Sequence, residues 1–191
     1  QDERLLLIME YASDGDLRTY LKSKNNTLTI EKKVKLAFDV TKGLYYLHKI
    51  NIIHRDLHAK NIVIHEGKAK ITDFGNSKFV DEQTRLHNGV FGVLPYIAPE
   101  LLITSSNGSC SKASDIYSLG VLFWEIVSCK IPFEGYSHDK LLIVRIIDGC
   151  REECVGNNIP RKYSELYKSC WVGEPEKRPN IGDIREIMDD I

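Results

Sequence analysis

The sequence lacks the features that would place it in several specialised classes of protein. Its formal net charge is −1 over 191 residues. The sequence therefore lacks the excess of positive charge that would predict binding to nucleic acid or to an anionic membrane. No apolar run approaches the roughly 20 residues that a membrane-spanning helix needs. Internal repeats, low-complexity tracts and linkers rich in Pro or Ser are also absent. With 42% hydrophobic and 28% charged residues, the composition indicates one globular domain with a single core.

The cysteines form no pattern typical of a metal site or a disulfide framework. The five cysteines lie at positions 110, 129, 150, 154 and 170, without a Cys-x-x-Cys pair and without a histidine cluster near them. An odd number of scattered cysteines indicates reduced thiols in an intracellular protein. The sequence begins at Gln1 and shows no signal peptide. We therefore expect a cytoplasmic protein that binds neither nucleic acid nor membrane.

Hydrophobic periodicity predicts a mainly helical domain with a small β component. The expected elements are a buried strand over residues 5–9, a short helix over 16–22, a long amphipathic helix over 30–47 capped by Thr29, a hairpin of 62–64 with 69–71, a helix over 116–127 opened by Ser114-Asp115, and a last helix with Ile181, Ile184, Ile187 and Met188 on one face. The helix over 116–127 is apolar on nearly all sides, which indicates a position at the centre of the domain.

Four polar motifs follow one another in a fixed order. His54-Arg55-Asp56 is followed by Asn61, then by Asp73-Phe74-Gly75, and Ala98-Pro99-Glu100 closes the series. This order and spacing resemble the catalytic domain of protein kinases. The resemblance covers essentially the whole chain. It implies an α+β, mainly helical fold, with the last strand of the N-terminal lobe and the hinge in residues 1–12 and the C-terminal lobe in 13–191.

The resemblance also implies which residues carry phosphoryl transfer from ATP to a protein substrate. Asp56 would orient the substrate hydroxyl and accept its proton. Lys60 lies four residues further along the same catalytic loop. Asn61 and Asp73 offer the oxygen ligands that Mg²⁺ prefers, with Asp73 connecting a metal ion to the phosphates and Asn61 holding a second one.

The beginning of the chain resembles the segment of kinases that binds the nucleoside of ATP. Met9 would guard the pocket behind the adenine, and the backbone of Glu10 and Ala12 would hydrogen-bond its edge. Asp16 would reach the ribose hydroxyls, and Val63 would lie under the base.

Further positions match residues that stabilise the kinase core. Asp115 would hold the backbone of the catalytic loop, and His54 and Phe74 would connect two of the motifs to the core. Glu100 would form an ion pair with Arg178. These roles are structural, so no acid, base or ligand function is expected of His54.

Several phosphate-binding parts of a kinase are absent from the 191 residues. The sequence contains no Gly-x-Gly-x-x-Gly loop, no lysine that would pair with the α- and β-phosphates, and no glutamate to hold that lysine. Three interpretations remain open: an intracellular signalling enzyme that requires these parts, an inactive lobe that binds proteins as a scaffold, and an incomplete coding sequence. We expect the chain alone to be inactive and to associate with itself through its exposed N-terminal strand.

The pattern around the catalytic loop is mixed with respect to the acceptor. His58 stands where serine/threonine kinases place a lysine, whereas Lys60 stands where tyrosine kinases favour a basic residue. The overall pattern resembles the tyrosine-kinase-like group and favours serine or threonine over tyrosine. Thr84 is expected to be phosphorylated and to pair with Arg55. Asn76 occupies a position that is usually hydrophobic, and it is expected to loosen the packing of its turn.

Overall fold

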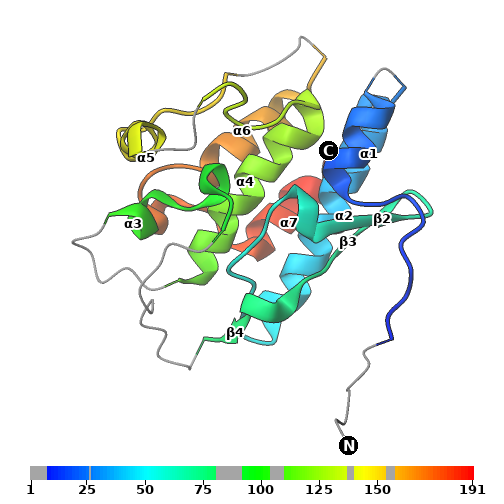
Figure 1. Ribbon diagram of the computed structural model, residues 1–191, viewed down its shortest axis with the longest axis horizontal. Helices are drawn as coiled ribbons and strands as arrows, with labels where there is room; N and C mark the ends of the chain where they lie inside the picture. Colours follow the sequence, from blue (N-terminus) through cyan, green and yellow to red (C-terminus); the bar gives the residue numbers. More distant parts are fainter. Residues whose placement is uncertain (1–7, 26, 81–91, 104–109, 137–139, 154–157) are drawn as a thin grey trace, which may run out of the picture.

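The computed structural model describes residues 8–25, 27–80, 92–103, 110–136, 140–153 and 158–191 (Figure 1). This part of the chain is mainly helical, with two small antiparallel pairs of strands. The helices are α1 (Leu17–Lys24), α2 (Ile30–Lys49), α3 (Pro99–Leu102), α4 (Lys112–Ser128), α5 (Lys140–Ile147), α6 (Arg161–Cys170) and α7 (Ile181–Asp189). The strands are β1 (Ile52–Ile53), β2 (Ile62–His65), β3 (Lys68–Ile71) and β4 (Lys78–Phe79).

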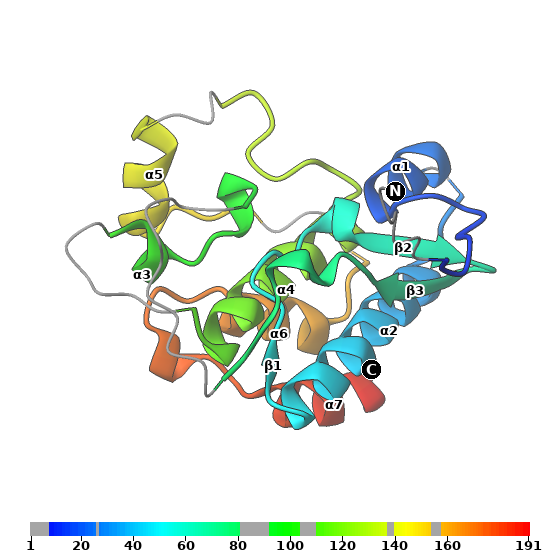
Figure 2. The same ribbon diagram turned by 60° about the horizontal axis from the view of Figure 1, so that its bottom comes forward.

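Helix α4 forms the centre of the hydrophobic core, as its mostly apolar sequence predicts. All residues from Ser114 to Val127 are buried. Helices α2 and α6 pack against α4, and α7 packs against α2 (Figures 1 and 2). Gly120 allows the close approach of α6, because a Cβ at this position would lie 2.8 Å from the Cβ of Cys170. The helix begins at Lys112, earlier than Ser114-Asp115, because Ser111 and Ser114 form a capping box.

The structure confirms the predicted cap at Thr29 and has a second polar cap at Asp16. The Asp16 side chain accepts a hydrogen bond from Thr19 N and begins α1, and the Thr29 side chain accepts one from Lys32 N and begins α2. Ile181, Ile184 and Met188 of α7 are buried. Ile187, the fourth residue predicted on this face, is 37% exposed.

The predicted hairpin is confirmed as β2–β3, with Ile62 opposite Ile71 and His65 opposite Lys68. Its two-residue turn is Glu66-Gly67, where both residues have positive φ (50° and 70°), as tight hairpin turns require. Strand β3 packs on α2, so the hairpin is fixed to the helical core (Figure 2). The N-terminal segment joins the outer side of β2, where Ile64 exchanges hydrogen bonds with Asp14 N and Gly15 O.

The buried strand expected over residues 5–9 is not found in its described part. Residues 5–7 lie outside the described residues. Ile8 and Met9 form no strand, and their exposed fractions are 92% and 68%. A strand needs a hydrogen-bonded neighbour, and none of the residues that the structure describes pairs with Ile8 or Met9. The prediction of burial is therefore wrong for these two side chains.

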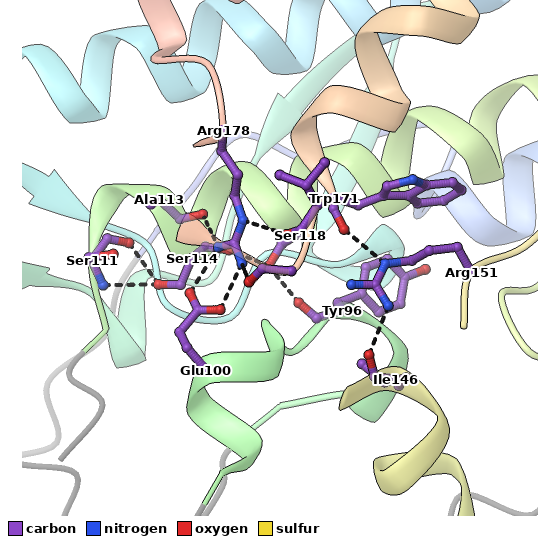
Figure 3. A network of polar contacts seen from close by, with 12 residues as sticks. Tyr96, Glu100, Ser111, Ala113, Ser114, Ser118, Ile146, Arg151, Trp171 and Arg178 are labelled. Carbon is purple, nitrogen blue, oxygen red and sulfur yellow. Dashed lines mark hydrogen bonds and ion pairs between the residues drawn. The ribbon is translucent and has the colours of Figure 1, made fainter. Parts of the chain in front are cut away.

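The expected ion pair of Glu100 with Arg178 is confirmed and joins four segments of the chain (Figure 3). The Arg178 guanidinium donates two parallel hydrogen bonds to the Glu100 carboxylate, at 2.8 and 2.7 Å. It also donates to the carbonyl oxygens of Ala113, Val172 and Gly173. All five N–H donors of the guanidinium are thus used, which explains how this side chain is fully buried.

A second buried polar cluster connects α1 to α4. Arg18 donates to Glu125 (Nε–Oε1 2.9 Å) and to the hydroxyl of Tyr96 (2.7 Å), and that hydroxyl also donates to Glu125. Burial raises the pKa of the Glu125 carboxyl, although the hydrogen bond from Arg18 lowers it. The cluster fixes the segment before α3 relative to the residues that follow Asp16.

The cysteines and the helices can be compared with what the composition predicts. Of the cysteines, the four that the structure describes are free thiols. None of the helices in the described ranges combines the length and apolar character that a membrane crossing requires.

Candidate active site

The loop that contains His54, Arg55 and Asp56 is held by a single buried carboxylate. Asp115, 1% exposed, accepts hydrogen bonds from His54 N and Arg55 N, both at 2.9 Å. Its Oδ2 also lies 2.9 Å from His48 Nε2. Arg55 has a φ of 73°, a left-handed conformation that is unfavourable for a residue with a Cβ. The bonds to Asp115 stabilise this bend, as expected for Asp115.

His54 connects the His54-Arg55-Asp56 loop to the Asp73-Phe74-Gly75 turn. Its buried ring lies 3.0 Å from the carbonyl oxygen of Thr72 through Nε2, and its Nδ1 accepts from Asp56 N at 3.3 Å. Because a carbonyl only accepts, these two bonds require a neutral ring with its proton on Nε2. The Phe74 ring meets His54 edge-on, with centroids 5.5 Å apart. Both contacts support the structural role expected of His54.

The Asp56 carboxylate is contacted from two sides. Its Oδ2 accepts a hydrogen bond from the side-chain amide of Asn76 at 3.2 Å. Its Oδ1 lies 3.5 Å from His58 Nε2. Burial lowers the pKa of His58, although the neighbouring Asp56 raises it. The Asp56 side chain is partly buried and keeps an exposed fraction of 16%.

Hairpin β2–β3 brings Asn61 and Asp73 to the same place. Asn61 directly precedes β2 and Asp73 follows β3, and the backbone pairing continues beyond the strands through Thr72 N to Asn61 O at 2.9 Å. The Asn61 amide nitrogen donates to Asp56 O, which leaves the amide oxygen as the atom that can bind a cation. Asp73 is exposed and has a left-handed backbone, with φ 61° and ψ 72°. The site therefore offers one amide oxygen and one carboxylate.

This donor set fits Mg²⁺, which prefers oxygen ligands and keeps water and phosphate in its coordination sphere. Across the described ranges, no group of three or more His, Cys, Asp or Glu side chains could hold a metal by itself. A metal ion held by Asn61 and Asp73 would need its remaining ligands from a bound phosphate and water.

The residues expected on the nucleoside side lie along the N-terminal segment and β2. Met9 is exposed, and the Glu10 side chain forms ion pairs with Lys70 and His65. Ala12 O accepts from Gly15 N.

Asp16 and Val63, the other two residues expected to contact the nucleoside of ATP, are close in space. Asp16 and Val63 form an isolated β-bridge, so their backbones are adjacent. The Asp16 carboxylate also accepts from Thr19 N and Oγ1, which lowers its pKa although partial burial opposes this shift.

Of the remaining predicted residues, Lys60 is among those the structure describes. Lys60 is exposed, and its backbone N–H donates to His58 Nδ1. Thr84 lies outside the described residues. The contacts that Arg18, His58 and Asn76 make around the site were not predicted. Asn76 and His58 carried a signal in the sequence, since an amide stands at a usually hydrophobic position and a histidine where serine/threonine kinases place a lysine, whereas Arg18 carried none.

Comparison with known proteins agrees with this geometry. The family model described as "Protein tyrosine and serine/threonine kinase" matches residues 1–188. A serine/threonine/tyrosine-protein kinase of Arabidopsis thaliana is 32% identical over 185 residues, covering 96% of this chain and 46% of that protein. A probable LIM domain-containing serine/threonine-protein kinase of Dictyostelium discoideum is 32% identical over 188 residues, covering 98% of this chain and 28% of that protein.

The chain belongs to the protein tyrosine and serine/threonine kinase family. The mainly helical α+β fold is that expected of the family. The chain spans less than half the length of these curated relatives.

Proposed function

We propose that the protein containing this chain is an ATP- and Mg²⁺-dependent protein kinase that transfers the γ-phosphoryl group to a protein hydroxyl, with serine or threonine favoured over tyrosine. The observation that carries the proposal is the arrangement of the site. Asp115 and His54 hold a loop that places Asp56 beside Asn61, and the hairpin places Asn61 beside Asp73. Family membership and the names of the relatives support the same reaction class.

In the proposed mechanism, each residue contributes positioning or charge. Asp56 accepts a hydrogen bond from the substrate hydroxyl, orients its oxygen toward the phosphorus and takes up its proton. Asn61 and Asp73 hold the metal side of the nucleotide, where bound Mg²⁺ neutralises phosphate charge. Asp16 binds the ribose hydroxyls, and Val63 lies under the adenine. The backbone of Glu10 and Ala12 hydrogen-bonds the adenine edge, and Met9 guards the pocket behind it. Lys60 lies beside the substrate.

The scaffold alternative is not favoured, because the residues assigned to metal binding and proton transfer are all present. A cytoplasmic location, with no nucleic acid or membrane as partner, is part of the proposal. It agrees with the balanced charge and the scattered cysteines.

Changing Asp73 to alanine in the full-length protein tests the proposal. We expect Mg²⁺ to tighten binding of ATP to the wild type and to have no such effect on Asp73→Ala, because the variant lacks the carboxylate that would bind the metal ion accompanying the phosphates. Nucleotide titration with and without Mg²⁺ measures this. Transfer of labelled γ-phosphate to serine, threonine and tyrosine peptides identifies the acceptor. The exposed Asp148→Ala is the matched control. If the affinity of the wild type for ATP is the same with and without Mg²⁺, the proposed metal site is refuted.

The second prediction concerns the isolated 191-residue chain. Ile8, Met9 and Tyr11 are largely exposed, and neighbouring exposed apolar side chains promote association. We expect the sedimentation coefficient to rise with concentration, and the rise to be weaker in the Ile8→Ser/Met9→Ser double variant. Tyr46→Ser, an equally apolar-to-polar change on the exposed side of α2, should not weaken it. A concentration-independent monomer would contradict this expectation.

A further inference from the structure

One contact at the proposed active site comes from a residue with no assigned role. Asn76 ends the single 3₁₀ turn Phe74–Asn76, directly after the Asp73-Phe74-Gly75 motif. Its side-chain amide reaches back to the catalytic loop and donates to Asp56 Oδ2 at 3.2 Å. The expectation that Asn76 only loosens the packing of this turn does not account for this bond, because the amide has a specific anionic partner.

The surroundings of Asp56 give its two carboxylate oxygens different environments. Oδ2 is the atom that Asn76 holds. Oδ1 faces His58 and also Gly92, where a Cβ would lie only 3.3 Å away. The absence of a side chain at Gly92 therefore leaves room beside Oδ1. With Oδ2 bonded to Asn76 and Oδ1 3.5 Å from His58 Nε2, the orientation of the carboxylate is fixed, and Oδ1 faces the space beside Gly92.

We propose that Asn76 is a positioning residue for Asp56, and that its amide holds Oδ2 so that Oδ1 is directed to the substrate hydroxyl. This inference rests on the proposed kinase function. It also connects two parts of the site, because Asn76 lies three residues after the metal-binding Asp73. The proton acceptor is then aligned only when the Asp73–Asn76 turn has the conformation that the structure shows.

The hydrogen bond between Asn76 and Asp56 is expected to affect turnover more than the free energy of unfolding. Asn76 is exposed, and an exposed hydrogen bond adds little to the free energy of unfolding. In catalysis, by contrast, a reacting group must be held within a fraction of an ångström, and a small displacement is costly. Loss of the amide should therefore change turnover without changing stability.

The test compares Asn76→Leu, Asn76→Asp and Asn76→Gln in the full-length protein. Leucine matches asparagine in size but has no donor, aspartate also adds a negative charge beside Oδ2, and glutamine keeps the amide. We expect kcat to fall about tenfold for Asn76→Leu, the loss expected for one hydrogen bond to a charged group. The fall should be larger for Asn76→Asp and smaller for Asn76→Gln. The KM for ATP should stay within about twofold of wild type, since Asn76 does not touch the nucleotide side.

Steady-state kinetics and thermal unfolding of the same preparations decide the outcome. If Asn76 only fills space in its turn, leucine should raise the melting temperature and leave kcat unchanged. If Asn76→Leu and Asn76→Asp both turn over as fast as an active wild type, while Asp56→Asn is inactive, Asn76 does not position Asp56. The proposed kinase function would stand in that case. A wild type that transfers no phosphate would overturn the proposed function and this inference together.

Discussion

Replacing Asp56 by asparagine in the full-length protein is expected to lower phosphoryl transfer about 10²–10⁴-fold, the usual contribution of an oriented general base. Asparagine has the same shape, and its oxygen can still accept the Asn76 hydrogen bond that the carboxylate accepts. It cannot take up the substrate proton. The backbone contacts of residue 56 with Asn61 and His54 do not involve the side chain, so the loop should keep its conformation.

Turnover and nucleotide affinity need to be measured in parallel on Asp56→Asn. Affinity for ATP with Mg²⁺ should stay within about twofold of wild type, because the metal ligands are assigned to Asn61 and Asp73. Asp14→Asn, a change on the exposed segment before α1, is the matched control and should retain full turnover. Near-normal turnover in Asp56→Asn would remove Asp56 from the role of proton acceptor.

The second large effect is expected from Asp115→Ala, which should lower the free energy of unfolding by roughly 3–5 kcal/mol, as when one partner of a buried polar network is removed. The change leaves the buried N–H groups of His54 and Arg55 without their acceptor. It also removes the carboxylate beside the buried His48. Arg55 would then lack the contact that stabilises its left-handed backbone.

Urea-induced unfolding followed by circular dichroism measures this effect. Asp148→Ala, a change of the same chemistry at an exposed position, should alter the free energy of unfolding by less than about 0.5 kcal/mol. Asp115→Asn should lie between the two, because an amide keeps one acceptor but presents a donor to the second N–H group. If Asp115→Ala unfolds at the wild-type urea concentration, Asp115 does not hold the loop.

The sequence predicted those features that depend on neighbours along the chain. Helix α4 is buried because its residues are apolar on nearly every side, and α2 begins directly after Thr29 because a hydroxyl can cap the first turn. The two short apolar runs around Glu66-Gly67 predicted the hairpin that Asn61 precedes and Asp73 follows. These predictions required only local periodicity, cap chemistry and the resemblance to a family.

Features that depend on distant contacts could not be predicted in the same way. Arg18 and Glu125 are 107 positions apart, and no local pattern indicates that a surface helix donates to a buried carboxylate. The hydrogen bond between Asn76 and Asp56 spans 20 positions and depends on how two loops approach each other. The strand expected over residues 5–9 failed at Ile8 and Met9 because an apolar run indicates burial only when a neighbouring strand is available to pair with it.

The saturated guanidinium of Arg178 has a consequence for how this part of the protein opens. Its five hydrogen bonds join α3, the first turn of α4 and the segment after α6 to Arg178, which lies shortly before α7. None of these segments can move away alone without leaving a buried charged group partly unsatisfied. Local opening of α3 is therefore linked to opening of the C-terminal helices, and the four segments form one cooperative unit rather than separate ones. Lysine at position 178 would break this unit, since an ammonium group has three donors for the five positions now filled.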